Sequence, residues 1–227
     1  MNTSEFKKLI RKHYSPKIRE LGWKGSGFHY RKVEDNHVVK IFGIQGSWYG
    51  GSICCETAIH FDFIPDLSGK LYNKTTYASC LIRERLSPKG VGDYHWDLKE
   101  NEEENIKSIN EIWETFSNQG QKFYNDFENF PEPFLSIQPN DFNQRYWFGF
   151  GKKKRVKILN KYHIFNEIHF IWLLKEINLF FGNISKAREF SELGIEIVNE
   201  DAIKQRQRVR GTFDQSYFDS NIEMFKI

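Results

Sequence analysis

The sequence predicts an α+β protein: an N-terminal helix, an antiparallel sheet of about four or more strands, a long packing helix, then a helical C-terminal subdomain. Three observations predict this fold. Apolar residues recur at helical spacing near the start of the chain, at a period of two from Gly27 to Leu86, and at helical spacing again from Asn101. The 227 residues, 16% aromatic and 28% charged, are typical of a soluble globular protein and exclude collagen-like, disulfide-scaffold and membrane-spanning classes.

The first predicted helix covers residues 4–21, where the apolar side chains form one stripe. Its members are Phe6, Leu9, Ile10, Tyr14, Ile18 and Leu21. Ser15-Pro16 interrupts the stripe, so either the helix kinks there or a second helix begins with Ser15 as cap and Pro16 at its first position. Gly22 ends the helical run.

The period of two that follows predicts an antiparallel meander, since the connections are short and rich in turn residues. The candidate strands are Phe28–Val33, His37–Gln45, Ile53–Ile64 and Thr76–Leu86. In the third strand, one face is expected to be core and the other wetter. The core face carries Thr57, Ile59, Phe61 and Phe63, and the wetter face carries Glu56, Ala58, His60 and Asp62.

The clearest helix is predicted from Asn101 to Phe130, with Glu102-Glu103-Glu104 favouring its N-terminal dipole. Its Phe and Trp residues suit packing on a sheet. Pro131-Glu132-Pro133 breaks it and marks a boundary between a sheet domain, 1–131, and a mainly helical subdomain, 132–227, expected to pack on it. Helices are predicted there at Ile164–Phe181 and Ser185–Asn199.

The cysteines and the N-terminus indicate a cytoplasmic protein that does not enter a membrane. The chain starts with charged residues where a signal peptide needs an apolar stretch, and the apolar stretch Phe170–Leu174 is too short to span a bilayer. The odd count of three cysteines, with Cys54 and Cys55 adjacent and Cys80 alone, favours reduced and partly buried thiols.

Several short motifs resemble the bacterial domain-of-unknown-function family 4304. They are Ser15-Pro16 before Ile18 to Gly22-Trp23, the Phe28–Arg31 strand, Leu81–Leu86 with its Arg-x-Arg, and Asp93-Tyr94-His95-Trp96. Trp23 stands where that family tends to have Phe, and His95 where it tends to have Trp. The resemblance covers about residues 1–130 and implies the fold but no catalytic residues. Because some members lie beside toxin genes, it also suggests an immunity-type protein.

Glu56, His60 and Asp62 project from one face of one predicted strand and could serve as ligands of a divalent metal in a hydrolase. The alternative is a cross-strand charge ladder, in which Arg83 and Arg85 of the next strand pair with these carboxylates. We favour the ladder. The side chains of residues i and i+2 on one strand are too far apart to bind a metal ion by themselves, so further ligands from a neighbouring strand would be needed.

The loop before the long helix carries Asp93, His95, Trp96 and Asp97. It is either a recognition surface or an anchor, with Trp96 filling the sheet edge and Asp97 capping the helix. The expected partner-binding residues are Arg83, Arg85, Asp93, His95 and Trp96, because Arg and Trp dominate interface hot spots. Trp48, Trp96 and Trp147 all fall in predicted loops or weak strands.

Basic residues gather in the second part of the chain, although the net charge is only +3. One cluster is Lys152, Lys153, Lys154 and Arg155, and the other is Lys204, Arg206, Arg208 and Arg210. On an extended segment the second cluster would face one way and could neutralise phosphates of a nucleic acid. Alternatively, it is a solvated helix face shared with Glu200 and Asp201.

The leading hypothesis is a non-catalytic cytoplasmic protein-binding module, of the immunity type in its most specific form, whose partner is another protein of unknown identity. Motifs for a nucleophile or a phosphate-cradling loop are absent from the sequence, and no cofactor is predicted. The alternatives are nucleic-acid binding through the basic clusters and metal-dependent hydrolysis through Glu56, His60 and Asp62.

Overall fold

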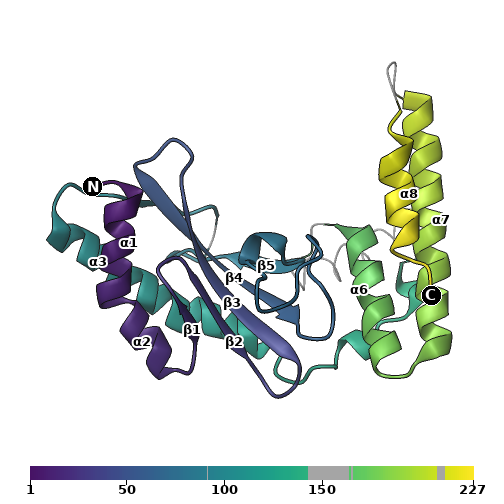
Figure 1. Cartoon of the computed structure of the whole chain (residues 1–227), viewed down its shortest axis with the longest axis horizontal. Coiled ribbons are helices and arrows are strands. Elements are labelled where there is room, and N and C mark those ends of the chain that lie inside the picture. The colour runs from purple at the N-terminus through teal and green to yellow at the C-terminus, as the bar shows by residue number, and fades with distance from the viewer. Residues whose placement is uncertain (91, 143–163, 165, 209–212) are drawn as a thin grey trace. The chain divides into compact units, whose positions relative to one another are not determined.

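The computed structural model describes residues 1–227 except 91, 143–163, 165 and 209–212. The chain forms two compact units, Met1–Phe130 and Pro131–Ile227 (Figure 1). The first unit contains an antiparallel sheet and its helices, and the described part of the second is mainly helical. The predicted α+β class is therefore confirmed.

Two short helices open the first unit: α1, Thr3–His13, and α2, Ser15–Glu20. A capping box between Asn2 and Glu5 starts α1. Of the two interpretations of Ser15-Pro16, the separate second helix is correct. The expected cap is wrong, however, because Tyr14 occupies the cap position of α2 and the Ser15 hydroxyl lies 2.6 Å from the Tyr30 hydroxyl.

The sheet is antiparallel, with strand order β1-β2-β3-β4-β5 and β6 paired to β4 beside β5. Its strands are β1 Lys24–Ser26, β2 His29–Val33, β3 Val38–Gly46, β4 Ser52–Phe61, β5 Ile82–Arg85 and β6 Trp96–Asp97. The meander predicted from the period of two supplies β2 to β5. The fourth predicted strand is shorter than expected, because Tyr77–Ser79 forms the 3-10 turn η1 and only Ile82–Arg85 pairs with β4.

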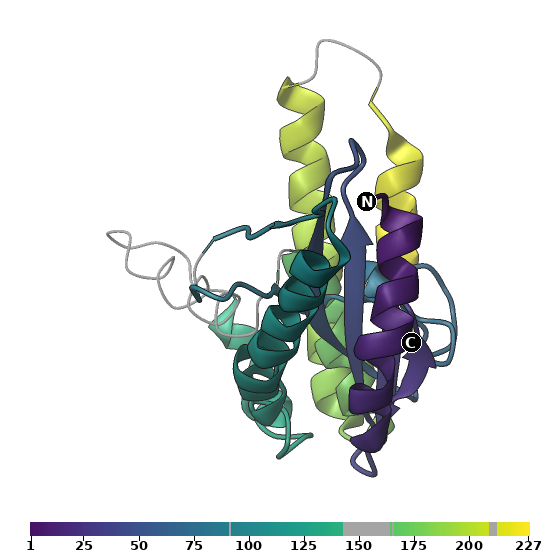
Figure 2. The same ribbon diagram turned by 90° about the vertical axis from the view of Figure 1, so that its left-hand side faces the viewer.

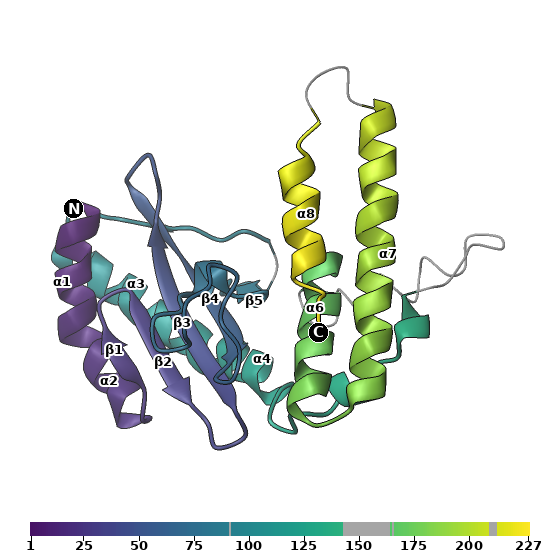
Figure 3. The same cartoon turned by 45° about the vertical axis from the view of Figure 1, so that its right-hand side comes forward.

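One face of the sheet is covered by helices, α3 and α4 passing behind the strands in Figure 3. The predicted long helix consists of α3 Glu102–Thr115, a π-helical turn η2 at Phe116–Gly120 and α4 Gln121–Asn125. Aromatic rings fill the interface: Phe42 of β3 lies 5.3 Å from Tyr14 and 5.0 Å from Phe116, measured between ring centroids. The high aromatic content thus builds the core between helices and sheet.

The opposite face of the sheet is buried as well, which corrects the expectation of a wetter face. Residues 62–81 fold over it, and Tyr77 and Cys80 pack with Val39, Ile41 and Ala58 in a second, smaller core. Both faces of β4 are consequently buried from Ile53 to Phe61. The polar side chains of β4 on this face, Glu56 and His60, are therefore buried, and their hydrogen-bond partners must come from the protein.

The described residues of the second unit form two short 3-10 turns and three helices. They are η3 Phe134–Ser136, η4 Pro139–Asp141, α6 Glu167–Phe180, α7 Ile184–Arg208 and α8 Gln215–Glu223. The sequence predicts α6 and the first part of α7 but not α8. Lys175 of α6 is buried, and its ammonium donates to the carbonyl oxygens of Met224 and Lys226 at 2.7 and 3.3 Å. This lysine fastens the end of the chain to α6.

In the described part of the chain, no helix has both the length and the apolarity to cross a bilayer.

Candidate functional site

Glu56 lies buried in β4 and binds two arginines of β5. Arg85 is its register partner across the two strands, and Arg83 pairs with Ala58, two positions further along the same face. Arg85 Nη2 donates to Glu56 Oε1 at 2.8 Å, and Arg83 Nη1 donates to Oε2 at 3.4 Å. The ladder expected from the alternation of the two strands is therefore present at Glu56.

Asp93 and His95 continue this arrangement to the surface. Arg85 Nη1 donates to Asp93 Oδ1 at 2.5 Å, and His95 Nε2 lies 3.4 Å from Asp93 Oδ2. The Glu56 side chain is 6% exposed, whereas that of Asp93 is 63% exposed. We call Glu56, Arg83, Arg85, Asp93 and His95 the charge row. It runs from a buried carboxylate, through arginines, to an exposed carboxylate and imidazole.

The charge row also shifts the pKa of two of its members, Arg85 and Asp93. Burial alone would lower the pKa of the Arg85 guanidinium, but hydrogen bonds to Glu56 and Asp93 raise it above its ordinary value. The hydrogen bond from Arg85 is also the main reason that the pKa of Asp93 is lowered. Around neutral pH, Arg85 and Asp93 therefore remain an ion pair.

The backbone under the arginines is fixed by a glutamine of the π-helical turn. The Gln119 amide donates to Glu84 Oε1 at 2.7 Å and accepts from the Ser87 backbone N–H at 2.9 Å. Glu84 stands between the two arginines of β5, with its side chain on the opposite face of the strand. The strand that carries Arg83 and Arg85 is thereby held to the helical layer.

Trp96 belongs to β6. Of the two interpretations of this residue, a recognition surface or an anchor at the sheet edge, the structure supports the anchor. Its side chain is buried, and its indole N–H donates to Glu111 Oε2 of α3 at 2.7 Å. The residue therefore has almost no surface to present to a partner. The accompanying expectation that Asp97 caps the long helix is wrong, because Asn101 accepts from the Glu103 backbone N–H and is the N-cap of α3.

The three residues of the metal alternative are each committed to other partners. Glu56 binds the two arginines, His60 Nε2 lies 3.0 Å from the Ile64 carbonyl oxygen, and Asp62 Oδ1 lies 3.0 Å from His37 Nδ1. Burial lowers the pKa of His60. Within the described residues, no three His, Cys, Asp or Glu side chains are grouped so that they could hold a metal ion.

In the second basic cluster, Lys204 and Arg206 lie on a helix instead of an extended segment, because α7 continues to Arg208. Residues two apart on a helix point in nearly opposite directions, so these cations do not form one stripe. Lys204 binds Glu200 at 3.2 Å and Asp201 at 3.5 Å, as the solvated-face interpretation predicts. The described residues exclude Lys152, Lys153, Lys154, Arg155 and Arg210, and do not include the Arg208 side chain.

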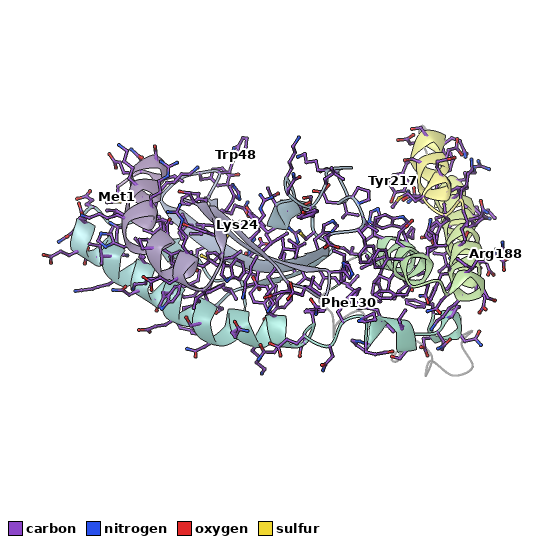
Figure 4. All side chains as sticks on the ribbon, turned by 60° about the horizontal axis from the view of Figure 1, so that its bottom comes forward. Met1, Lys24, Trp48, Phe130, Arg188 and Tyr217 are labelled. Carbon is purple, nitrogen blue, oxygen red and sulfur yellow. The ribbon has the colours of Figure 1, made fainter. Side chains whose placement is uncertain are left out.

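The turn between β3 and β4 carries two solvent-exposed aromatic residues that are not among the partner-binding residues predicted from the sequence. Trp48 and Tyr49 are each 96% exposed, and the Trp48 side chain points away from the ribbon in Figure 4. We call this pair the aromatic tip. In the sequence, the aromatic tip is indicated only by a tryptophan, Trp48, in a predicted hairpin loop. The exposure of the two rings depends on which surfaces the rest of the chain covers, so residue type alone does not predict it.

Comparison with known protein families identifies a match. Residues 14–126 match the family described as Domain of unknown function (DUF4304). The chain belongs to this family. The search of curated proteins and the search of solved structures returned no match.

The DUF4304 match lies within the first unit and contains both the charge row and the aromatic tip. It begins at Tyr14, one residue before the Ser15-Pro16 motif on which the resemblance rests. Leu81–Leu86 and Asp93–Trp96, the two later motifs, supply the arginines, the exposed carboxylate and the buried indole of the site. His95, one of the two departures from the family pattern, is half exposed at the outer end of the charge row.

Proposed function

We propose that this DUF4304 protein is a non-catalytic protein-binding module whose contact surface includes the exposed end of the charge row. The observation that carries the proposal is the fixed position of Arg85. Its guanidinium is held on one side by buried Glu56 and on the other by exposed Asp93. An arginine positioned before binding loses little conformational entropy when a partner covers it.

The exposed end of the charge row presents both signs of charge within one small area. Asp93 and His95 keep 63% and 43% of their side chains exposed, while Arg83 and Arg85 keep 34% and 29%. Such an arrangement suits a partner with complementary charges, which gives specificity and a fast association rate more than affinity alone. Trp96 is left out of this contact surface because its ring is buried.

The more specific form of the proposal is an immunity-type protein that inhibits a toxin by covering part of its surface. The family resemblance suggests this form. A cytoplasmic location accompanies it, supported by three cysteines that are free and buried in the structure. Unpaired thiols suit a reducing compartment.

Comparative affinity capture tests the proposal. The full chain is used as bait in native lysate supplemented with the product of the neighbouring gene, and is compared with Asp93→Arg and with Lys122→Glu. Asp93 is exposed, so its replacement reverses the charge without disturbing the core, and Lys122 is an exposed residue of α4 in the same unit. We expect a protein that the wild type and Lys122→Glu retain and Asp93→Arg loses. Equal recovery with all three baits, or no retained protein, would contradict the proposal.

A further inference from the structure

The aromatic tip stands at the end of the longest pair of strands in the sheet. The β3–β4 hairpin pairs from Val38↔Phe61 to Gly46↔Ile53, and its turn projects past the first turn of α1 (Figures 1 and 2). Gly46 lies so close to α1 that a Cβ there would be 2.8 Å from Thr3 Cγ2. The base of the hairpin is therefore braced by α1, while its end is free.

The turn itself is ordered by hydrogen bonds and glycines. The Ser47 N–H donates to the Ser52 carbonyl at 2.9 Å, and the Gly50 N–H donates to the Ser47 carbonyl at 3.1 Å. The Tyr49 N–H donates to Ser47 Oγ at 3.3 Å. Gly50 and Gly51 both adopt φ of +75°, a backbone conformation that favours glycine. Two large rings are thus presented on a backbone that is arranged before any partner arrives.

The charges around the aromatic tip indicate the chemistry of its partner. No charged residue occurs from Ile41 to Cys55, so the hairpin end itself contributes no cation for phosphates or anionic lipids. Charged residues of both signs lie at its side, where Asp97 and Lys99 form an ion pair at 3.4 Å. An apolar centre with a polar rim of mixed sign is the composition of a protein–protein interface.

The charge row and the aromatic tip belong to the same end of the sheet. Ile53 pairs with Trp96 and Ser52 with Asp97, so the segment after Asp93 runs directly along the start of β4. The Leu98 N–H then donates to the Gly51 carbonyl at 2.8 Å. Glu56 lies four positions after Ser52 along β4, a distance of about 13 Å, which one interface of ordinary size can cover.

We infer that the aromatic tip is the anchor of this interface: Trp48 and Tyr49 insert into an apolar pocket of a partner protein whose surface also contacts the charge row. The inference rests on the proposed function and specifies its partner as a protein with such a pocket. Each side chain can bury about 150–250 Å² of surface on insertion. Trp and Tyr are typical interface hot spots, because the ring can be buried while its N–H or O–H stays hydrogen-bonded at the edge of the interface.

A photo-crosslinking experiment on the full chain, followed by affinity measurements, tests the inference. A p-benzoylphenylalanine replaces Trp48 in one variant and Leu71, which is 66% exposed on the loop over the second core, in the control. We expect position 48, and not position 71, to cross-link to the same protein that Asp93→Arg loses. With that protein purified, Trp48→Ala should bind at least about 30-fold more weakly than the wild type, Trp48→Phe should retain most of the affinity, and Leu71→Ala should bind normally.

The outcomes separate the inference from the function on which it rests. If Asp93→Arg abolishes binding while Trp48→Ala and Tyr49→Ala bind like the wild type, the inference is wrong and the proposed function stands. Binding of the wild type, but not of Trp48→Ala, to neutral phosphatidylcholine vesicles would overturn it in favour of a bilayer. A dimer in solution that Trp48→Ala makes monomeric would overturn it in favour of a second copy. Absence of any captured protein removes both proposals.

Discussion

The ring of Tyr77 occupies the space that a side chain at Gly43 would need. A Cβ at Gly43 would lie 1.9 Å from Tyr77 Cδ1. Gly43 is also the register partner of Glu56, so the absence of a side chain there lets the loop that carries Tyr77 close over the sheet beside the charge row. Burial on this face raises the pKa of Tyr77 to about 12.

Gly43→Ala is accordingly expected to destabilise the first unit. The added methyl group must displace the ring or the loop, at a cost of about 1–3 kcal/mol in the free energy of unfolding. Urea denaturation measures the change. In a Tyr77→Ala background the space is already open, so the same substitution should cost much less. An equal cost in both backgrounds would show that the contact with Tyr77 is not its cause.

A similar contact in the second unit predicts an effect of unusual sign. Gly194 lies inside α7, where alanine would ordinarily stabilise the helix by about 1 kcal/mol. A Cβ there, however, would lie 2.2 Å from Phe225 Cε1. Gly194→Ala should therefore lower stability and speed amide hydrogen exchange in α7 and α8, measured by mass spectrometry. In a Phe225→Ala background the ordinary stabilisation should return, and its failure to do so would contradict the packing.

Asp66 predicts a stability that depends on acid pH. Burial would raise the pKa of this carboxyl, but hydrogen bonds from Ser79, Ser68 and backbone N–H groups lower it well below its ordinary value. The stabilisation is complete above the unfolded-state pKa of about 4 and is lost as the pH falls toward the folded-state pKa. The difference in free energy of unfolding between wild type and Asp66→Asn should therefore be largest above about pH 5 and shrink from about pH 4 downward. A constant difference across this range would contradict the ionised carboxylate as its source.

The three cysteines should be unreactive in the folded protein. Burial raises the pKa of Cys54, Cys55 and Cys80, so the reactive thiolate is disfavoured as well as inaccessible. Ellman's reagent at pH 8 should label none of them within minutes, and all of them once the chain is unfolded in guanidinium chloride. Rapid labelling of one thiol in the native protein would show that the part of the sheet carrying it opens locally.

The strands of the sheet could be predicted where their pattern is local. The alternation of apolar and polar residues predicts β2, β3 and β4 almost to their ends, because one face packs on helices. The short strand β1, Lys24–Ser26, has no buried residue, and β6 has two residues, so neither gives a periodic signal. The burial of Ala58 and His60 also escapes prediction, since it depends on a loop that returns from residues 62–81.

The site shows the same division between local and distant information. The pairing of Glu56 with Arg85 follows from alternation on neighbouring strands, and the sequence predicts it. The position of Asp93 depends on the path of a loop. No periodic pattern in the sequence therefore indicates the hydrogen bond by which Asp93 becomes the outer partner of Arg85. The exposure of Tyr49 depends on which surfaces the remaining chain covers, so residue type alone does not predict it.

The bare end of the β3–β4 hairpin has a further consequence for how the protein behaves at high concentration. Fifteen consecutive uncharged residues, Ile41–Cys55, carry two uncovered rings at their turn, and charge is what normally keeps such segments apart. Without a partner, the molecules should attract one another through these rings in a salt-insensitive way. Trp48→Ser should consequently raise the solubility limit of the protein.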